Sequence, residues 1–371
     1  MPTVAIWTSR GSQDEFLLAP VVETLRAGFA ASPDVANVVV GHGVPSLTNR
    51  NTSSPLLAVL ATLVAGDIFV WVGEFFPQLI GESDRVVPWR QLGERSVRRI
   101  YYQCEPAHGC KARRPACYAE RRRKLGPPPQ DCREQRGQMQ SWGPPVDELW
   151  DFSAHNLDAC FNASASAPTT LRHVPIANVA LTPTESATGV ALGAAAGDTG
   201  TLLFPGNVDC CPLRHRCFAE LRRLLGRSRV RHVYKAWSEQ SFAQRVLSSS
   251  IFLNLHKDCG DAHNPVTWRS PMLLRHSKLV LSERASARDE ETYKGMVLFF
   301  DNISAIAGAF LQLSASGEWR PLAARAGRLF RQQFEPTRVF ERAGVYAGLR
   351  LRRPPGARRV SQQVSQMHRV R

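Results

Sequence analysis

The chain has 371 residues, of which 43% are hydrophobic and 21% charged, and its formal net charge is +15. This length exceeds what one ordinary hydrophobic core serves, so two domains of roughly 150 residues each are expected. The sequence has no run of about eighteen apolar residues and no basic start followed by an apolar signal core. We therefore expect neither a membrane span nor a secretory signal, and we predict a cytoplasmic location.

The positive charge is concentrated in three stretches, 98–143, 212–235 and 350–371, which together hold more than the whole excess. Solvated faces are the plainest interpretation. Attraction to a polyanion or a peripheral contact with an acidic membrane surface is the alternative. Because the three stretches contain no recognisable nucleic-acid-reading motif, no specific nucleic-acid partner is expected.

The nine cysteines are odd in number and scattered, which predicts free thiols in a reducing compartment rather than a disulfide framework. Cys104, Cys110, Cys117 and Cys132, with His108 nearby, raise the question of zinc. Their spacing lacks the short Cys-x-x-Cys unit of structural zinc sites, so no metal is expected there.

The first half alternates apolar strands with amphipathic segments, which predicts a parallel sheet with crossover helices. Residues 107–143 then lose apolar periodicity and read as a mobile insertion, and the small-residue stretch 181–199 reads as a linker. The predicted strands are 4–8, 38–40, 67–72, 99–102, 146–153 and 171–176, and the predicted helices are 14–29, 56–64 and a short one containing His155 and Asn156.

The second half repeats the alternation, so the fold class is α/β, with two Rossmann-like doubly wound domains facing across a cleft. Its predicted strands are 201–204, 230–234, 250–254 and 279–281, and its predicted helices are 214–225, 239–248, one entered near 264–265, 303–313 and 318–343. The domains are expected at 1–180 and 200–320, with a helix over 321–349 returning toward the first domain and a disordered basic tail over 350–371.

The segment from Ser250 to Asn302 predicts a phosphate-binding site. It runs from an apolar strand into Asn254-Leu255-His256-Lys257, then through a loop into a helix, and then into a strand that ends in Ser282-Glu283. At the carboxyl edge of a parallel sheet, helix amino termini present free N–H groups and partial positive charge. Lys257, Arg269 and the adjacent backbone therefore suit a diphosphate, which makes a nucleotide the first ligand to consider.

Five motifs occur in the order and spacing of a known family. They are 147–151 (DELWD) with His155-Asn156, 173–176 (HVPI), 204–207 (FPGN), 254–257 (NLHK) and 281–283 (LSE). Over residues 65–315 the chain thereby resembles the CgeB-like glycosyltransferases, which have the GT-B fold of glycosyltransferase families 1 and 4.

The resemblance implies a nucleotide-sugar donor in the second domain and an acceptor, of unknown identity, on the side of the first. By it, Asn207 brings backbone close to the donor, Lys257 and Arg269 take the diphosphate, and Glu283 lies near the nucleotide or sugar hydroxyls. Asn254, His256 and Ser282 complete the donor candidates. Many GT-B enzymes have a ribose-binding Glu early in the helix after the basic loop, where this chain has Val266-Thr267-Trp268.

Glycosyl transfer requires stabilisation of the departing diphosphate, either by a divalent metal on an Asp-x-Asp pair or by cationic side chains and a helix terminus. The sequence contains no Asp-x-Asp, so we expect neither metal nor cofactor. An inverting enzyme also needs a base. The best candidates are Glu74 and Glu105, which follow apolar strands, together with His155.

Two other functions remain open at this point. A degenerate GT-B fold that binds nucleotides or glycans without turnover would fit the missing ribose-binding Glu. A dinucleotide oxidoreductase fits less well, since no Gly-x-Gly-x-x-Gly follows any predicted strand.

Overall fold

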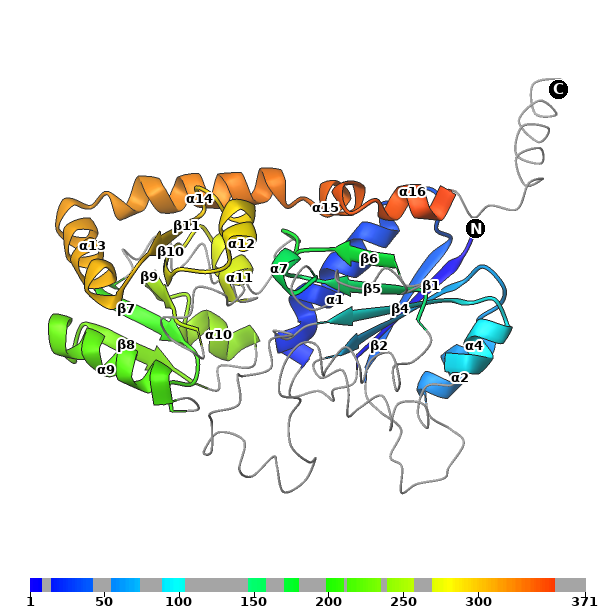
Figure 1. Cartoon of the computed structure of the whole chain (residues 1–371), viewed down its shortest axis with the longest axis horizontal. Helices are drawn as coiled ribbons and strands as arrows, with labels where there is room; N and C mark the ends of the chain where they lie inside the picture. Colours follow the sequence, from blue (N-terminus) through cyan, green and yellow to red (C-terminus); the bar gives the residue numbers. More distant parts are fainter. Residues whose placement is uncertain are drawn as a thin grey trace.

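The computed structural model describes residues 1–8, 15–42, 55–73, 89–103, 146–157, 170–179, 198–209, 212–234, 239–256 and 269–350. The predicted insertion, the tail after residue 350 and most of the predicted linker lie outside these ranges. The described strands form two sheets in which neighbouring strands run parallel. With the helices packed against them, the sheets make two α/β domains, as predicted (Figure 1).

The first sheet has six strands in the order β2-β1-β3-β4-β5-β6. Side chains along all of β3 are buried, as its uninterrupted apolar sequence predicts for a strand covered on both faces. Its strands are β1 (Thr3–Thr8), β2 (Asn37–His42), β3 (Ile68–Gly73), β4 (Arg98–Gln103), β5 (Glu148–Asp151) and β6 (Thr170–His173), and its helices are α1 (Glu15–Ala30), α2 (Pro55–Thr62), α4 (Trp89–Glu94) and α7 (Ala154–Asn156).

The second sheet has five strands in the order β11-β10-β9-β7-β8. Strand β7 begins at residue 198, inside the predicted linker, so that boundary was placed too late. The strands are β7 (Asp198–Pro205), β8 (Val230–Val233), β9 (Ser249–Asn254), β10 (Leu279–Glu283) and β11 (Val297–Phe300), and the helices are α9 (Pro212–Leu225), α10 (Glu239–Arg245), α11 (Arg269–Arg275), α12 (Ala287–Thr292) and α13 (Ile303–Ser316).

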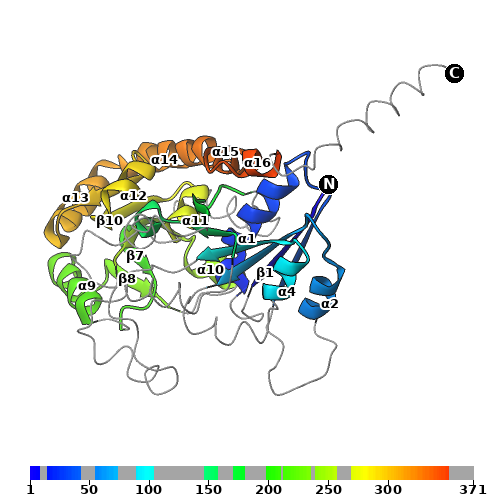
Figure 2. The same ribbon diagram turned by 45° about the vertical axis from the view of Figure 1, so that its right-hand side comes forward.

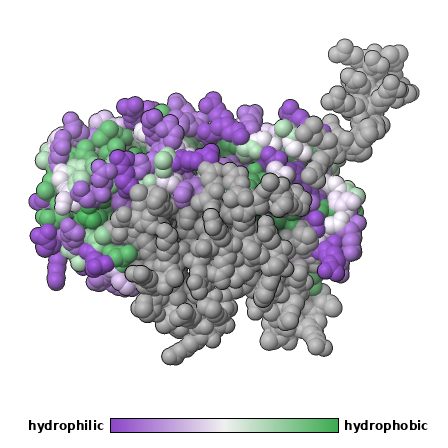
Figure 3. All heavy atoms as spheres, viewed as in Figure 1, coloured by the Kyte–Doolittle hydropathy of each residue, from purple (hydrophilic) through white to green (hydrophobic). Residues whose placement is uncertain are grey.

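The last part of the chain is a row of helices that runs over both sheets in Figures 1 and 2, and its outward side is mostly hydrophilic in Figure 3. The row contains α14 (Trp319–Gln333), α15 (Pro336–Arg342) and α16 (Val345–Arg350). The prediction of one continuous helix over 318–343 was wrong, because Pro336 begins a new helix and the residue before a proline disfavours helical geometry.

Aromatic packing fixes this row to both domains. Phe334, at the end of α14, stacks on Tyr293 of the second domain with centroids 5.3 Å apart. Phe340 in α15 packs edge-on against Phe29 of α1 at 5.1 Å. A Cβ at Gly28 would overlap the Phe340 ring, so only glycine permits this approach.

Polar groups also join the two halves. The Ser153 hydroxyl, just before α7, donates to the Asp289 carboxylate of α12 at 2.9 Å in a buried contact. The Arg172 guanidinium of β6 reaches the Ala343 carbonyl at 2.7 Å. Buried polar contacts of this kind are costly to break, so they fix how α7 and α12 meet.

Arg172 belongs to a buried ion cluster with Glu148 and Arg98. Burial alone would raise the pKa of Glu148, but Arg98, Arg172 and the indole N–H of Trp150 outweigh it and hold the pKa below its ordinary value. The Glu148 carboxylate therefore stays ionised inside the first domain.

Two further observations bear on the expectations from sequence. Cys217 is disulfide-bonded, so the expectation of free thiols is wrong for this residue. None of the helices in the described ranges has the length and apolar content needed to cross a bilayer.

Candidate functional site

The candidate site lies where β7 and β9 end, next to each other in the second sheet. The chain order reverses between these strands, and the carboxyl edge at such a reversal is where open α/β sheets bind ligands. The chain leaves β7 through Gly206 and Asn207. The Asn207 side-chain oxygen accepts the backbone N–H of Asp209 at 2.9 Å, which fixes the turn into α9.

Arg214, in the first turn of α9, joins the ends of the two strands. Its side chain is 3% exposed. One guanidinium nitrogen donates to the Asn207 carbonyl at 3.0 Å, and Nε donates to the His256 carbonyl at 3.1 Å. The turn after β7 and the turn after β9 are thus held by one side chain.

The ring of Phe204 brings a second guanidinium to the same place. The centre of the Arg214 guanidinium lies 5.3 Å from the ring centroid, and that of Arg269, at the start of α11, lies 5.4 Å from it. A Cβ built on Gly206 would come within 2.8 Å of the ring and 2.9 Å of an Arg269 nitrogen. Bare backbone and a half-buried guanidinium are therefore in direct contact, an arrangement that suits an anion.

The ends of β9 and β10 form a buried hydrogen-bond network. The Asn254 amide donates to the Ser282 hydroxyl at 2.9 Å, and that hydroxyl donates to the Glu283 carbonyl at 2.7 Å. The Glu283 carboxylate accepts the backbone N–H of His256, whose Nε2 donates to the Arg284 carbonyl at 3.0 Å. These contacts are internal to the protein, so the four predicted donor residues hold the strand ends in place.

The structure therefore brings most of the predicted donor residues together along the ends of β7, β9 and β10. They are Asn207, Asn254, His256, Arg269, Ser282 and Glu283. Lys257 lies outside the described residues. Which of them contact a donor stays a prediction.

Sequence reasoning missed two residues here. Arg214 was included in a solvated basic face, although it is buried. Ser270, in the first turn of α11, is completely buried, and its hydroxyl has no hydrogen-bond partner within the described part of the chain.

Of the predicted base candidates, Glu74 and Glu105 lie outside the described residues, just after the last described positions of β3 and β4. His155 is half-buried in α7, which packs against α12 of the second domain. His155 is thus placed where the domains meet, and its role as a base stays a prediction.

A metal site was not expected, and the described ranges contain no cluster of three or more His, Cys, Asp or Glu side chains that could hold an ion. The cysteines considered for zinc, from Cys104 to Cys132, lie outside those ranges.

Comparison with known proteins gives a fold and no family. Neither the protein-family models nor the curated proteins include a match to the chain. Among solved structures, Anabaena HepE in complex with UDP and glucose has a TM-score of 0.53 at 10% identity, covering 94% of this chain and 100% of that one. The complex of HepE with UDP-glucose has a TM-score of 0.51 with the same identity and coverage.

The sucrose-phosphate synthase of Thermosynechococcus elongatus has a TM-score of 0.53 at 13% identity and covers 95% of this chain and 98% of its own. Because the matches extend over both sheets, the chain has the GT-B fold. At these identities the likeness establishes the fold alone. The narrower resemblance to CgeB-like enzymes stays a prediction.

Proposed function

We propose that the protein is a glycosyltransferase that moves a sugar from a nucleotide-sugar donor to an acceptor. One observation carries the proposal: two guanidiniums, from Arg214 and Arg269, meet at one aromatic ring beside the bare backbone of Gly206. They do so at the strand reversal of the second sheet. The GT-B fold and neighbours solved with UDP and UDP-glucose support a nucleotide-sugar donor.

The chemistry follows from the charges. An acceptor oxygen attacks the anomeric carbon, the bond from that carbon to the diphosphate breaks, and the acceptor proton passes to a base. Arg269, with Lys257, would neutralise the departing diphosphate, and Arg214 would position the turns that approach it. Glu74, Glu105 and His155 are the proposed bases. We propose that cationic side chains act in place of a metal.

Calorimetric titration with UDP tests the donor site. The variant Arg269→Ala removes a guanidinium that can make two charge-assisted hydrogen bonds, so affinity should fall by about tenfold to a hundredfold. Arg325→Ala, on the exposed side of α14, removes the same charge elsewhere and should leave affinity unchanged. Equal affinity in wild type and both variants would refute the site. Repeating the titration with EDTA tests metal independence.

The alternative is a non-catalytic module that binds a nucleotide or glycan. It is favoured by the Val266-Thr267-Trp268 segment where relatives have a ribose-binding Glu, and by the engagement of the Glu283 carboxylate with backbone. Hydrolysis and transfer assays with a panel of nucleotide sugars separate the two. Donor binding without turnover, across a range of acceptors, would support the module.

A further inference from the structure

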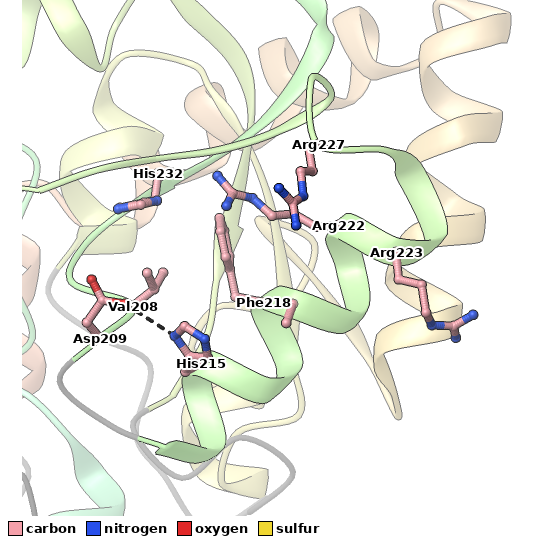
Figure 4. Close-up of a pocket in the computed structure, with 9 residues that line it drawn as sticks. Val208, Asp209, His215, Phe218, Arg222, Arg223, Arg227 and His232 are labelled. Carbon is pink, nitrogen blue, oxygen red and sulfur yellow. Dashed lines mark hydrogen bonds and ion pairs between the residues drawn. The ribbon is translucent and has the colours of Figure 1, made fainter.

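A concave site lies on the outer side of the second domain, between α9 and the edge strand β8. It has a volume of about 430 Å³, which is in the range of small-molecule sites. Three arginines and two histidines line it, and Figure 4 shows the side chains of Arg222 and Arg227 next to each other, whereas Arg223 points away from them. The residues that carry the argument are Asp209, His215, Phe218, Arg222, Arg223, Arg227 and His232.

Arg222 is held in place by the protein. Its Nε donates to the Val230 carbonyl at 3.2 Å, and its guanidinium lies 4.8 Å from the Phe218 ring centroid. Its two terminal nitrogens have no hydrogen-bond partner among the described residues. Because the guanidinium is already ordered, it loses little further conformational entropy when a ligand binds. It also presents a planar pair of donors to the pocket.

The three arginines of the pocket have no acidic partner among the residues that the structure describes. Within the described ranges, no carboxylate is in ion-pair distance of Arg222, Arg223 or Arg227. The acidic side chain at the pocket, Asp209, is instead 3.2 Å from His215 Nδ1 at the opposite end. Three cations on one concave surface, with no ion-paired carboxylate among the described residues, give it a positive potential.

The pKa of His232 responds to the charges around the pocket. Its ring stands edge-on to Phe218 with centroids 5.5 Å apart, and its Nδ1 is buried with no hydrogen-bond partner in the described part of the chain. Burial first, and then the charge of Arg222, lower the pKa of His232, while Asp209 opposes them. The imidazole is therefore neutral near pH 7 and can donate to or accept from a ligand.

We propose that this pocket binds a small phosphate-bearing molecule, with its phosphate at Arg222 and Arg227 and with Arg223 on the rim. Phosphate matches the planar donor pairs of arginine, and a concave site of this volume has the size of a small-molecule site. The pocket adjoins the candidate donor edge, since Asp209 lines it and donates its backbone N–H to the Asn207 side chain, but Arg269, the proposed diphosphate ligand, does not line it. Phosphate binding in this pocket would be a function separate from the proposed transfer reaction.

The test uses the full chain and inorganic phosphate, with a readout local to the pocket. The chain has ten histidines, and NMR of labelled histidine, with His232→Gln to assign the signal, follows the pKa of His232. A bound phosphate dianion should raise this pKa by about one unit. An unchanged pKa at saturating phosphate would overturn the proposal.

A charge-matched pair of double variants tests the contacts. Arg223→Ala with Arg227→Ala removes two exposed pocket arginines, and should weaken phosphate binding by about tenfold or more. Arg216→Ala with Arg229→Ala removes two exposed arginines from the same region outside the pocket, and should weaken it less than about twofold. Equal losses in the two double variants would mean diffuse charge only, and would overturn the site.

Two further experiments are needed. One distinguishes a lipid phosphate from a free phosphate as the ligand, and the other distinguishes this pocket from the candidate donor site. Vesicles with phosphatidic acid, compared with phosphatidylcholine alone, distinguish a lipid headgroup from a free phosphate; binding to neither probe overturns the proposal. UDP affinity should be unchanged in the Arg223/Arg227 double variant, and Arg269→Ala should leave the phosphate response of His232 intact. Failure of the donor site is thereby distinguishable from failure of this one.

Discussion

Replacing Arg214 by methionine is the sharpest perturbation of the candidate donor edge. The substitution keeps an unbranched side chain over Phe204 but removes the donors to the carbonyls of Asn207 and His256. Both carbonyls would lose a partner at the junction of β7, α9 and β9. We therefore expect a loss of stability together with a loosened turn at Asn207.

The magnitude follows from the two hydrogen bonds. A buried carbonyl left without its partner costs about 1–3 kcal/mol, and relief of the burial cost of the guanidinium offsets part of the sum. The expected loss in the free energy of unfolding is about 2–4 kcal/mol. Arg214→Lys keeps the charge but cannot reach both carbonyls with a planar fork, so it should lie between wild type and Arg214→Met.

Urea unfolding followed by circular dichroism measures this loss, in the transition that reports the second domain. Arg216→Met is the matched control, because Arg216 is two residues away on the same helix and exposed; its change should stay within about 0.5 kcal/mol. UDP titration on the folded variants should show weaker binding for Arg214→Met. A loss below about 1 kcal/mol, with UDP affinity unchanged, would refute the bridging role of Arg214.

Three other outcomes are expected. Gly206→Ala should weaken UDP binding and lower stability, because its Cβ would overlap the buried Phe204 ring at 2.8 Å and the Arg269 guanidinium at 2.9 Å; unchanged affinity by calorimetry would contradict this. Glu148→Gln should lower the free energy of unfolding by about 3–5 kcal/mol, since it leaves two arginines around a neutral amide, and urea titration against the more exposed Asp147→Asn checks it. Burial lowers the pKa of Lys278 to about 8 from 10.5. Between pH 8 and 10.5 the unfolded chain therefore binds more protons than the folded one, so stability rises with pH. Over this range the free energy of unfolding of wild type should rise by up to about 3 kcal/mol relative to that of Lys278→Met. Urea titrations of both proteins at the two pH values measure this change, and a constant difference between them would contradict it.

Sequence reasoning located the strands well where apolar runs are long and buried on both faces. Strands β3 and β9 are buried along their whole lengths. The apolar runs 68–72 and 251–253 within them indicate this directly. Strand β11 was not predicted. It lies at an edge of the second sheet, and its four residues, Val297–Phe300, are all apolar, so the sequence held a strand signal that was overlooked.

The candidate site was predictable in part for the same reason. Asn254 and Glu283 were identified because they directly follow buried strands, and strand ends at one sheet edge must lie together. Their partners were not predictable. That the Glu283 carboxylate accepts the His256 N–H depends on the register of β9 against β10, which no local pattern contains.

The burial of Arg214 could have been predicted from its position in the helical pattern. It lies four residues before Phe218 and seven before Leu221, which places it on the buried face of α9. An arginine on the apolar face of a helix is buried on folding, so its guanidinium needs hydrogen-bond acceptors inside the protein. From the sequence, Arg214 was instead counted among the solvated charges of 212–235, and so its burial was not predicted.

The same helical period explains how one basic helix can serve two sites. His215, Ala219, Arg222 and Arg223 repeat at spacings of three and four, on a strip of α9 next to the buried one. The inward strip carries one arginine with its donors engaged by backbone carbonyls. The adjacent strip carries cations that no described carboxylate neutralises, around a pocket. One strip is buried and the other is mostly exposed, so the positive excess of this region is not uniform. It divides into a cation that organises the sheet edge and cations available to an anion from solution.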